Sequence, residues 1–411
     1  MPVIQAPGVY VFEERGAPPI AGVGTSTAAF IGVVDTGSAG FQMPLRPGSD
    51  TERLAPAPVN EPRLVTNFDQ FRNSFGDFQA GNRILAHSVF GFFLNGGGRC
   101  WVVRVENLQT ITTALTELAR RDEIALVAAP GALDLAVRAE IIAHCENLGD
   151  RFAIIDGQRA RVSNEDGSIT TIDIEVNPIK GGNPPLGNSD YAGLYFPWIQ
   201  VVDRTLAPAP AEIEARRPVP GAQLLAPPSA FIAGIYARVD ATRGVHKAPA
   251  NEVVRGALGL EYETTRGEQE GLNPAGVNVI RGFNGNIKVW GARTLGGEAN
   301  GEFRYINVRR LLLFLRESID EGTQFAVFEP NAPPLWQKIR RSVTGFLTNV
   351  WRDGALFGNT PEEAFFVRCD ETTNPPEVRE IGQVITEIGV AVVKPAEFVI
   401  FRISQSAGAS A

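Results

Sequence analysis

Short apolar segments alternate with helical segments through the first third of the chain, and this alternation constrains the fold more than any other feature. The strand-type runs are Ala29–Val34, Trp101–Val105, Ile124–Ala129 and Phe152–Asp156. The helical patterns between them are Arg83–Leu94, Ile111–Arg120 and Leu133–Leu148. Strands joined by helices are covered on both faces, so they are continuously apolar. The sequence therefore predicts an α/β layer with a mostly parallel sheet.

The amino-acid composition changes after the predicted α/β layer, in residues 158–185. Asn164–Gly167 is a turn signal between alternating segments, so we expect residues 158–185 to be a small β decoration on the α/β domain. The run Tyr195–Val202 is expected to return to the sheet. Ser229–Asp240 is expected to be a helix with Ser229 as its N-cap, since it follows two prolines.

A third region begins near Leu272 and mixes helices and strands. Val308–Ile319 is predicted to be an amphipathic helix that ends before Gly322, and Trp336–Trp351 a second one. The expected strands are Lys288–Trp290, Phe303–Tyr305, Gln324–Phe328, Phe365–Arg368, Val384–Val393 and Phe398–Ile403. This region is therefore α+β.

Strand-type residues also stand close to both ends of the chain. Near the start they are Val9, Tyr10, Val11 and Phe12, and near the end Phe398, Val399, Ile400 and Phe401. An apolar strand in such a place has to pair with something or it becomes an aggregation edge. Both segments therefore need a partner sheet.

Composition narrows the function classes. The formal net charge is −8, whereas a diffuse nucleic-acid binder is normally basic, so we expect no nucleic-acid partner. The first residues lack a signal peptide, and no apolar run is long enough to span a membrane, so we expect synthesis in the cytoplasm and no direct membrane insertion. Three cysteines without a CxxC motif are expected to be reduced, buried thiols.

A search for catalytic chemistry identifies no constellation of nucleophile, base and metal ligands. The three histidines His87, His144 and His246 stand in no metal-binding motif. The loop Gly22–Thr27 is glycine-rich, but it lacks the lysine of a phosphate-binding loop and precedes the nearest strand. We therefore expect no catalytic, cofactor-binding or metal-binding residue.

A basic cluster stands on the second amphipathic helix. Lys338, Arg340 and Arg341 are expected on the side opposite the apolar stripe that Trp336 begins. Such a cluster is either a solvated helix face or a contact surface for an acidic partner.

Several blocks resemble the family of contractile tail sheath proteins. Near the start these are Ala6–Val11 and Pro19–Gly32, and in the middle Pro197–Trp198, Pro227–Ser229, Ala237–Asp240 and Arg243–Asn251. The resemblance is densest in Trp290–Leu295, Tyr305–Arg310, Phe328–Asn331 and Pro395–Phe398. It runs nearly end to end and is weakest in residues 158–185.

The resemblance implies a structural protein without a cofactor. Its subunits stack as hexameric rings around an inner tube protein, between a baseplate and a terminator or cap protein. The two terminal segments add strands to neighbouring subunits. Contraction of the metastable assembly drives the tube through a target envelope, and the helix of Lys338, Arg340 and Arg341 contacts the tube. Such particles assemble in the bacterial cytoplasm and form phage tails or tail-like particles that are released from the cell.

The resemblance also implies a domain plan, in which an inner α+β domain is built from both chain ends and an outer α/β domain is inserted into it. We expect residues 1–27 to be an N-terminal arm and part of the inner domain, and 28–271 the outer domain. Residues 272–395 continue the inner domain, and 396–411 form the C-terminal arm. The alternatives are a nucleotide-dependent α/β enzyme, which requires phosphate binding at Gly22–Thr27, and another structural polymer.

Overall fold

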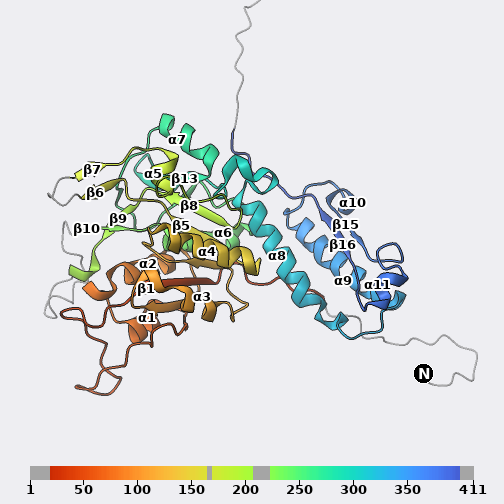
Figure 1. The fold of residues 1–411 in the computed structure, drawn as a ribbon, viewed down its shortest axis with the longest axis horizontal. Helices are drawn as coiled ribbons and strands as arrows, with labels where there is room; N and C mark the ends of the chain where they lie inside the picture. The colour runs from red at the N-terminus through yellow and green to blue at the C-terminus, as the bar shows by residue number, and fades with distance from the viewer. Residues whose placement is uncertain (1–18, 164–168, 207–222, 399–411) are drawn as a thin grey trace, which may run out of the picture. The chain divides into compact units, whose positions relative to one another are not determined.

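The computed structural model describes residues 19–163, 169–206 and 223–398 (Figure 1). The chain forms two compact units. The larger unit comprises Val23–Arg316 and Val392–Ala411, and the smaller unit comprises Met1–Gly22 and Glu317–Ala391.

A nine-stranded sheet organises the larger unit. Its strands, in spatial order, are β11 (Glu252–Val253), β14 (Asn286–Val289), β13 (Val277–Phe283), β8 (Ala192–Phe196), β5 (Phe152–Asp156), β4 (Leu126–Ala128), β1 (Ala28–Val33), β3 (Cys100–Val105) and β2 (Arg63–Val65). The six strands from β13 to β3 are mutually parallel, and antiparallel strands flank them at both edges. This arrangement confirms the predicted α/β layer.

Helices cover both faces of this sheet. One apolar cluster joins Phe30 to α1 (Phe68–Phe75), α2 (Arg83–Asn95) and α6 (Ser229–Arg243), which Figure 1 labels around the strands. Ile31, the next residue of β1, points into a second cluster with α3 (Thr112–Leu118) and α4 (Leu135–Leu148). Successive side chains of a strand point to opposite faces, so an uninterrupted apolar run serves both clusters.

The helices α2 and α6 cross closely because each carries a glycine at the contact. A Cβ atom on Gly91 would lie 2.4 Å from the ring of Phe231, and one on Gly234 would lie 2.4 Å from the carbonyl oxygen of Phe92. Real Cβ atoms do not approach other atoms so closely, so larger residues at these positions would force the helices apart.

Other elements complete the larger unit. The run Tyr195–Val202 does not stay in one sheet, because β9 (Ile199–Val202) pairs with β10 (Gln223–Ala226) and β12 (Gly259–Leu260) in a separate three-stranded sheet. The remaining elements are β6 (Arg161–Ser163), β7 (Ile169–Thr171), α5 (Val176–Lys180), α7 (Arg266–Leu272) and the first part of α8 (Ile306–Thr323).

The smaller unit contains the last residues of α8, which is continuous across the division between the units. Its other elements are α9 (Pro333–Arg352), α10 (Pro361–Ala364), β15 (Phe365–Arg368), α11 (Pro376–Glu380) and β16 (Glu387–Val390). The apolar stripe of α9 is buried, with Val343 and Leu347 fully so, and α9 packs against β15. This is the predicted second amphipathic helix.

Four expectations about local structure are wrong. Ser229 is the first residue of α6 rather than its N-cap, because its backbone N–H and hydroxyl donate to the buried Asp156. Gly322 lies inside α8 and not beyond it, and it packs so closely on Ile20 that a Cβ atom there would lie 2.6 Å from that side chain. The expected strand Phe303–Tyr305 is reduced to one β-bridge between Arg293 and Tyr305. The expected strand Gln324–Phe328 begins instead with a 3₁₀ turn, Gln324–Ala326.

The boundaries of the two units differ from the expected ranges 28–271 and 272–395. Residues 272–316 belong to the larger unit, because β13 pairs in parallel with β8 of its sheet. Residues 392–411 are also assigned to the larger unit, whereas the N-terminal residues up to Gly22 are assigned to the smaller one.

The decoration at 158–185 is smaller than expected. The strands β6 and β7 pair antiparallel, as the turn signal predicts. However, Ala160 and Ile179 are fully buried in the cluster of α3 and α4, and the N–H of Ala160 donates to Glu261. The strand β7 is a surface feature, with Ile169 68% exposed, whereas Ala160 and Ile179 anchor the segment in the core.

Candidate assembly surfaces

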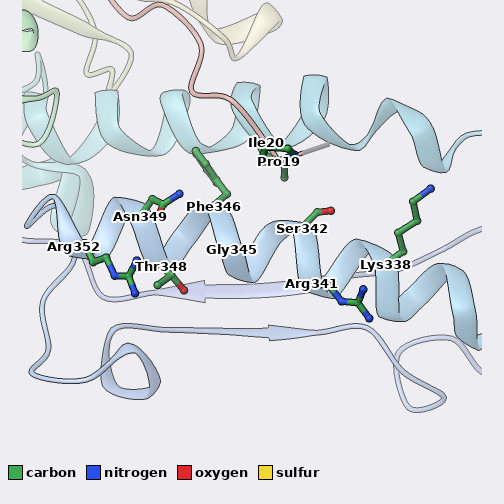
Figure 2. A pocket seen from close by; sticks show the side chains of 10 residues that line it. All are labelled: Pro19, Ile20, Lys338, Arg341, Ser342, Gly345, Phe346, Thr348, Asn349 and Arg352. Atoms are coloured by element: carbon green, nitrogen blue, oxygen red, sulfur yellow. The ribbon is translucent and has the colours of Figure 1, made fainter. Parts of the chain in front are cut away.

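A groove of about 450 Å³ runs along α9 in the smaller unit (Figure 2). It is lined by Pro19 and Ile20 and by one face of the helix: Lys338, Arg341, Ser342, Gly345, Phe346, Thr348, Asn349 and Arg352. Three cationic side chains therefore border one groove, with small and uncharged residues between them.

The helix period explains why these side chains share a face. Positions 338, 341, 345, 348 and 352 advance by three or four residues, so they stand above one another along an α-helix. Gly345 supplies no side chain and leaves the groove open. The ammonium group of Lys338 lies 4.4 Å from the centre of the Phe325 ring. This cation–π contact holds Lys338 in place at one end of the groove.

The groove is positive because its cations lack acidic partners. Among the described residues, no carboxylate forms an ion pair with Lys338, Arg341 or Arg352. The side chains of Arg341 and Arg352 are exposed. An acidic partner would therefore meet three cations that form no ion pair within the described part of the chain.

The predicted basic cluster is only partly brought together. Arg340 lies two positions beyond Lys338, about 200° around the helix, and its guanidinium approaches the carbonyl oxygen of Cys369 at 3.5 Å. It does not line the groove. The sequence analysis missed Arg352, which an extension of the three-and-four spacing from Lys338 and Arg341 would have found.

The second candidate surface is the two-stranded sheet of the smaller unit. Phe365 to Arg368 of β15 pair antiparallel with Val390 to Glu387 of β16. Within the described ranges each strand has a single partner, so each offers one open edge. Phe366 is 54% exposed on this sheet and packs over Gly389.

Most of the predicted arm residues lie outside the described part of the chain. These are Val9, Tyr10, Val11 and Phe12 near the start and Val399, Ile400 and Phe401 near the end. Phe398 is described and is 72% exposed.

The glycine-rich loop Gly22–Thr27 is held by the chain's own charges. The Thr25 hydroxyl donates to Asp240 at 2.6 Å, and the buried Arg310 donates to Asp240 at 2.6 Å and to the Thr25 carbonyl at 3.0 Å. The loop is therefore hydrogen-bonded to the buried ion pair between Arg310 and Asp240.

The carboxyl edge of the parallel sheet is also occupied by the protein itself. In α/β enzymes an anion often binds there, at a helix N-terminus. Here Asp156, at the end of β5, accepts from Ser229 N and Oγ at 2.8 Å and from Gly131 N at 3.0 Å. Burial raises the pKa of Asp156 to about 6 despite these donors. The chain's own carboxylate fills the place of an anionic ligand.

The other candidate groups have structural roles. His87 is buried; its Nδ1 bonds with the Arg83 carbonyl, and its Nε2 accepts from Arg204 N, while burial lowers its pKa. All three cysteines are buried and free, as predicted. In the described ranges no three acidic, histidine or cysteine side chains gather as metal ligands, and no helix is long and apolar enough to cross a membrane.

The chain thus combines an α/β unit with a smaller unit that carries a basic groove and, among the described residues, two strands with one partner each. The family model of the phage tail sheath protein central domain matches residues 107–295. That of the phage tail sheath C-terminal domain matches residues 298–406. This chain belongs to the tail sheath family, whose members are structural proteins and not enzymes, as the sequence predicts.

Individual relatives support this assignment. The tail sheath protein of Vibrio phage KVP40 is 29% identical over 174 residues, 41% of this chain and 24% of that protein. The contracted sheath complex of the extracellular contractile injection system PVC is 28% identical, with a TM-score of 0.74 over 99% of both chains. A chain of the six-fold symmetrised baseplate of the anti-feeding prophage is 27% identical, with a TM-score of 0.70 over 98% of this chain and 100% of that one.

The relatives differ in length. The aligned part spans 24%, 42% and 45% of the three curated phage and prophage sheath proteins. The injection-system sheath chain, in contrast, is matched almost completely.

Proposed function

We propose that this chain is the sheath subunit of a contractile tail-like injection system, which polymerises as stacked hexameric rings around an inner tube. Contraction of the assembly drives the tube through a target envelope. Near full-length similarity to a contracted injection-system sheath and to a chain of a six-fold baseplate supports this proposal. The partners are further copies of this chain, the tube protein, a baseplate and a terminator or cap protein. We propose assembly in the bacterial cytoplasm, before release of the particle.

The observation that carries the proposal is the sheet of the smaller unit, in which each strand has one partner among the described residues. The strands β15 and β16 make a two-stranded sheet, which is marginal on its own in water. The strand-type segments 9–12 and 398–401 are suited to complete such a sheet in a neighbouring copy. Main-chain hydrogen bonds would supply the affinity, and Phe366 would gain an apolar neighbour.

Removal of either segment tests this link between subunits. Deletion of residues 1–12, or of 399–411, should leave a folded, soluble subunit that forms no cylinders in negative-stain microscopy. Deletion of 404–411 alone is the control, because it removes only the polar tail. Long cylinders formed by either of the first two variants would contradict the proposal.

Proline substitution probes the same link without shortening the chain. Val11→Pro or Ile400→Pro removes one backbone donor and fits poorly into a paired strand, so each should impair assembly. Ala407→Pro, in the polar tail, is the matched control and should assemble normally.

We propose further that the groove of α9 contacts acidic groups of the inner tube. A sheath has to hold its tube before contraction and release it afterwards. Charged contacts provide register without the slow dissociation of a large apolar patch. The open cations Lys338, Arg341 and Arg352 suit such a contact, whereas Arg340 is turned toward Cys369.

Charge reversal tests the groove. The double variant Lys338→Glu and Arg341→Glu should fold normally and fail to form extended sheaths around the tube at physiological salt. Arg46→Glu with Arg120→Glu is the matched control, since these exposed cations belong to the larger unit. Normal extended particles from the groove variant would exclude this face as the main tube contact.

A further inference from the structure

The segment that follows β16 is fastened to the larger unit by one acidic side chain. The carboxylate of Glu397 accepts from Arg293 at 2.7 and 2.9 Å, from Asn273 Nδ2 at 2.7 Å and from the Tyr305 hydroxyl at 3.1 Å. All four residues belong to the larger unit. We name this set of contacts the C-terminal clasp.

The clasp is built as a strong contact. Only 3% of the Arg293 side chain and 19% of the Glu397 side chain are exposed. The guanidinium engages both carboxylate oxygens, and such charge-assisted, two-pronged bonds are about twice as strong as neutral ones. Arg293 also donates to the Asn273 carbonyl at 3.3 Å, which helps to orient its guanidinium.

Within the described part of the chain, Glu397 is the last residue with a polar side-chain contact. Residues 393–398 form no helix or strand, and Phe398 after the clasp is 72% exposed. Upstream, the smaller unit ends at Ala391. Between these two points Val392 forms a β-bridge, and Asn307 Nδ2 contacts the Val393 carbonyl at 3.4 Å.

We propose that the clasp fixes the point at which the C-terminal segment leaves the subunit, and so sets how far this segment reaches toward a neighbouring copy. This inference rests on the proposed sheath function. With the clasp closed, the chain is fixed to the larger unit as far as Glu397. With the clasp open, the last remaining described contact is that of Val393, so residues 394–397 are released, which is roughly 13 Å of extended chain.

The reach of the segment controls how well it pairs. A longer flexible linker lowers the effective concentration of its terminal strand at the neighbouring sheet. When a neighbouring copy pulls on the segment, a longer linker extends and transmits less of the force to the folded part of the subunit. A closed clasp therefore keeps neighbouring copies in register.

The experiment compares two carboxylates that bind the same arginine. Glu397→Gln keeps the side-chain volume and one acceptor oxygen but removes the charge. Glu298→Gln is the matched control, since Glu298 also contacts Arg293 but lies outside the C-terminal segment, with its side chain 57% exposed. A spin label on Ala396→Cys reports the clasp in the full-length subunit, and the three native cysteines are buried, so labelling is selective.

We expect Glu397→Gln to increase the mobile fraction of the label roughly 10- to 100-fold, as loss of a charge-assisted contact implies. Glu298→Gln should leave it near the wild-type level. In assembly, Glu397→Gln should give fewer or irregular cylinders. An immobile label in Glu397→Gln would overturn the clasp, and a mobile label with regular cylinders would overturn its role in reach. Failure of the unsubstituted chain to form cylinders would instead contradict the sheath function.

Discussion

The two sheets of this molecule contrast in how complete they are. The nine-stranded sheet has both faces covered, and the Phe152 side chain of its central strand β5 is fully buried. The two-stranded sheet leaves Phe366 half exposed and has one partner per strand in the described ranges. The first sheet needs nothing more to be stable, whereas the second is the kind that gains from added strands. The assembly contact that we propose therefore lies at the less complete of the two sheets.

One ion pair taken from each unit shows a similar difference in burial. Arg293 and Glu397 of the larger unit are mostly buried and share several further donors. Arg368 and Glu387, across β15 and β16, are 56% and 53% exposed. An exposed pair contributes at most about 1 kcal/mol, so it guides strand register more than it stabilises the unit.

The largest expected effect follows from replacing part of the larger unit. Exchange of residues 158–185 for a short Gly/Ser linker should abolish cooperative folding, because it removes the buried Ala160 and Ile179. Exchange of residues 162–170 alone should be tolerated, since it changes only the surface hairpin. Circular dichroism and thermal unfolding distinguish the two. Normal unfolding of the long replacement would show that the whole segment is decoration.

The next effect compares one phenylalanine from each sheet. Phe152→Ala should lower the free energy of unfolding by about 3–5 kcal/mol, the usual cost of a large cavity in a core. Phe366→Ala should cost much less, because the side chain is 54% exposed, and should reduce cylinder formation instead. Denaturant unfolding and negative-stain microscopy measure the two outcomes. An equal loss of unfolding free energy in both variants would contradict the proposed difference in completeness between the two sheets.

A smaller effect compares two hydrogen-bonded aspartates. Asp156→Ala leaves the N–H of Gly131 and both donors of Ser229 buried without an acceptor, which should cost about 2–4 kcal/mol. Asp370 accepts similar bonds from Thr372 in the smaller unit, but these are exposed, so Asp370→Ala should be far milder. Thermal unfolding of both variants gives the comparison.

The parts of the fold that the sequence predicts are those with a strong local pattern. The apolar runs of β1, β3 and β5 and the stripe of α9 identify buried strands and an amphipathic helix. The short runs Phe303–Tyr305 and Gln324–Phe328 are mistaken for strands, because a few apolar residues fit a strand and a turn equally well.

Long-range contacts account for the remaining differences. Ser229 looks like a helix cap, but its donors bind Asp156, which is distant in sequence. Gly322 looks like a helix end, but it lies within α8 and packs closely on the distant Ile20. The pairing of β13 with β8 likewise moves residues 272–316 into the larger unit. No local pattern contains this information, and the same holds for the contact between Arg293 and Glu397.

The smallest expected effect is a pH response confined to the buried pair. Burial acts to raise the pKa of Glu397, but hydrogen bonds from Arg293, Asn273 and Tyr305 and the Arg293 charge outweigh it and hold this pKa below its ordinary value of 4.5. A carboxyl group with a depressed folded-state pKa contributes stability above its unfolded pKa and loses it as the pH falls through the folded value. The clasp should therefore stay closed from neutral pH to about 4.5 and open below that, with Glu298 as the other carboxylate facing Arg293. The spin label on Ala396→Cys should become more mobile in this window, while Glu397→Gln should show the same mobility throughout. Unchanged mobility of the wild-type label in the folded protein, down to well below pH 4.5, would mean that a contact other than the Glu397 charge holds the segment.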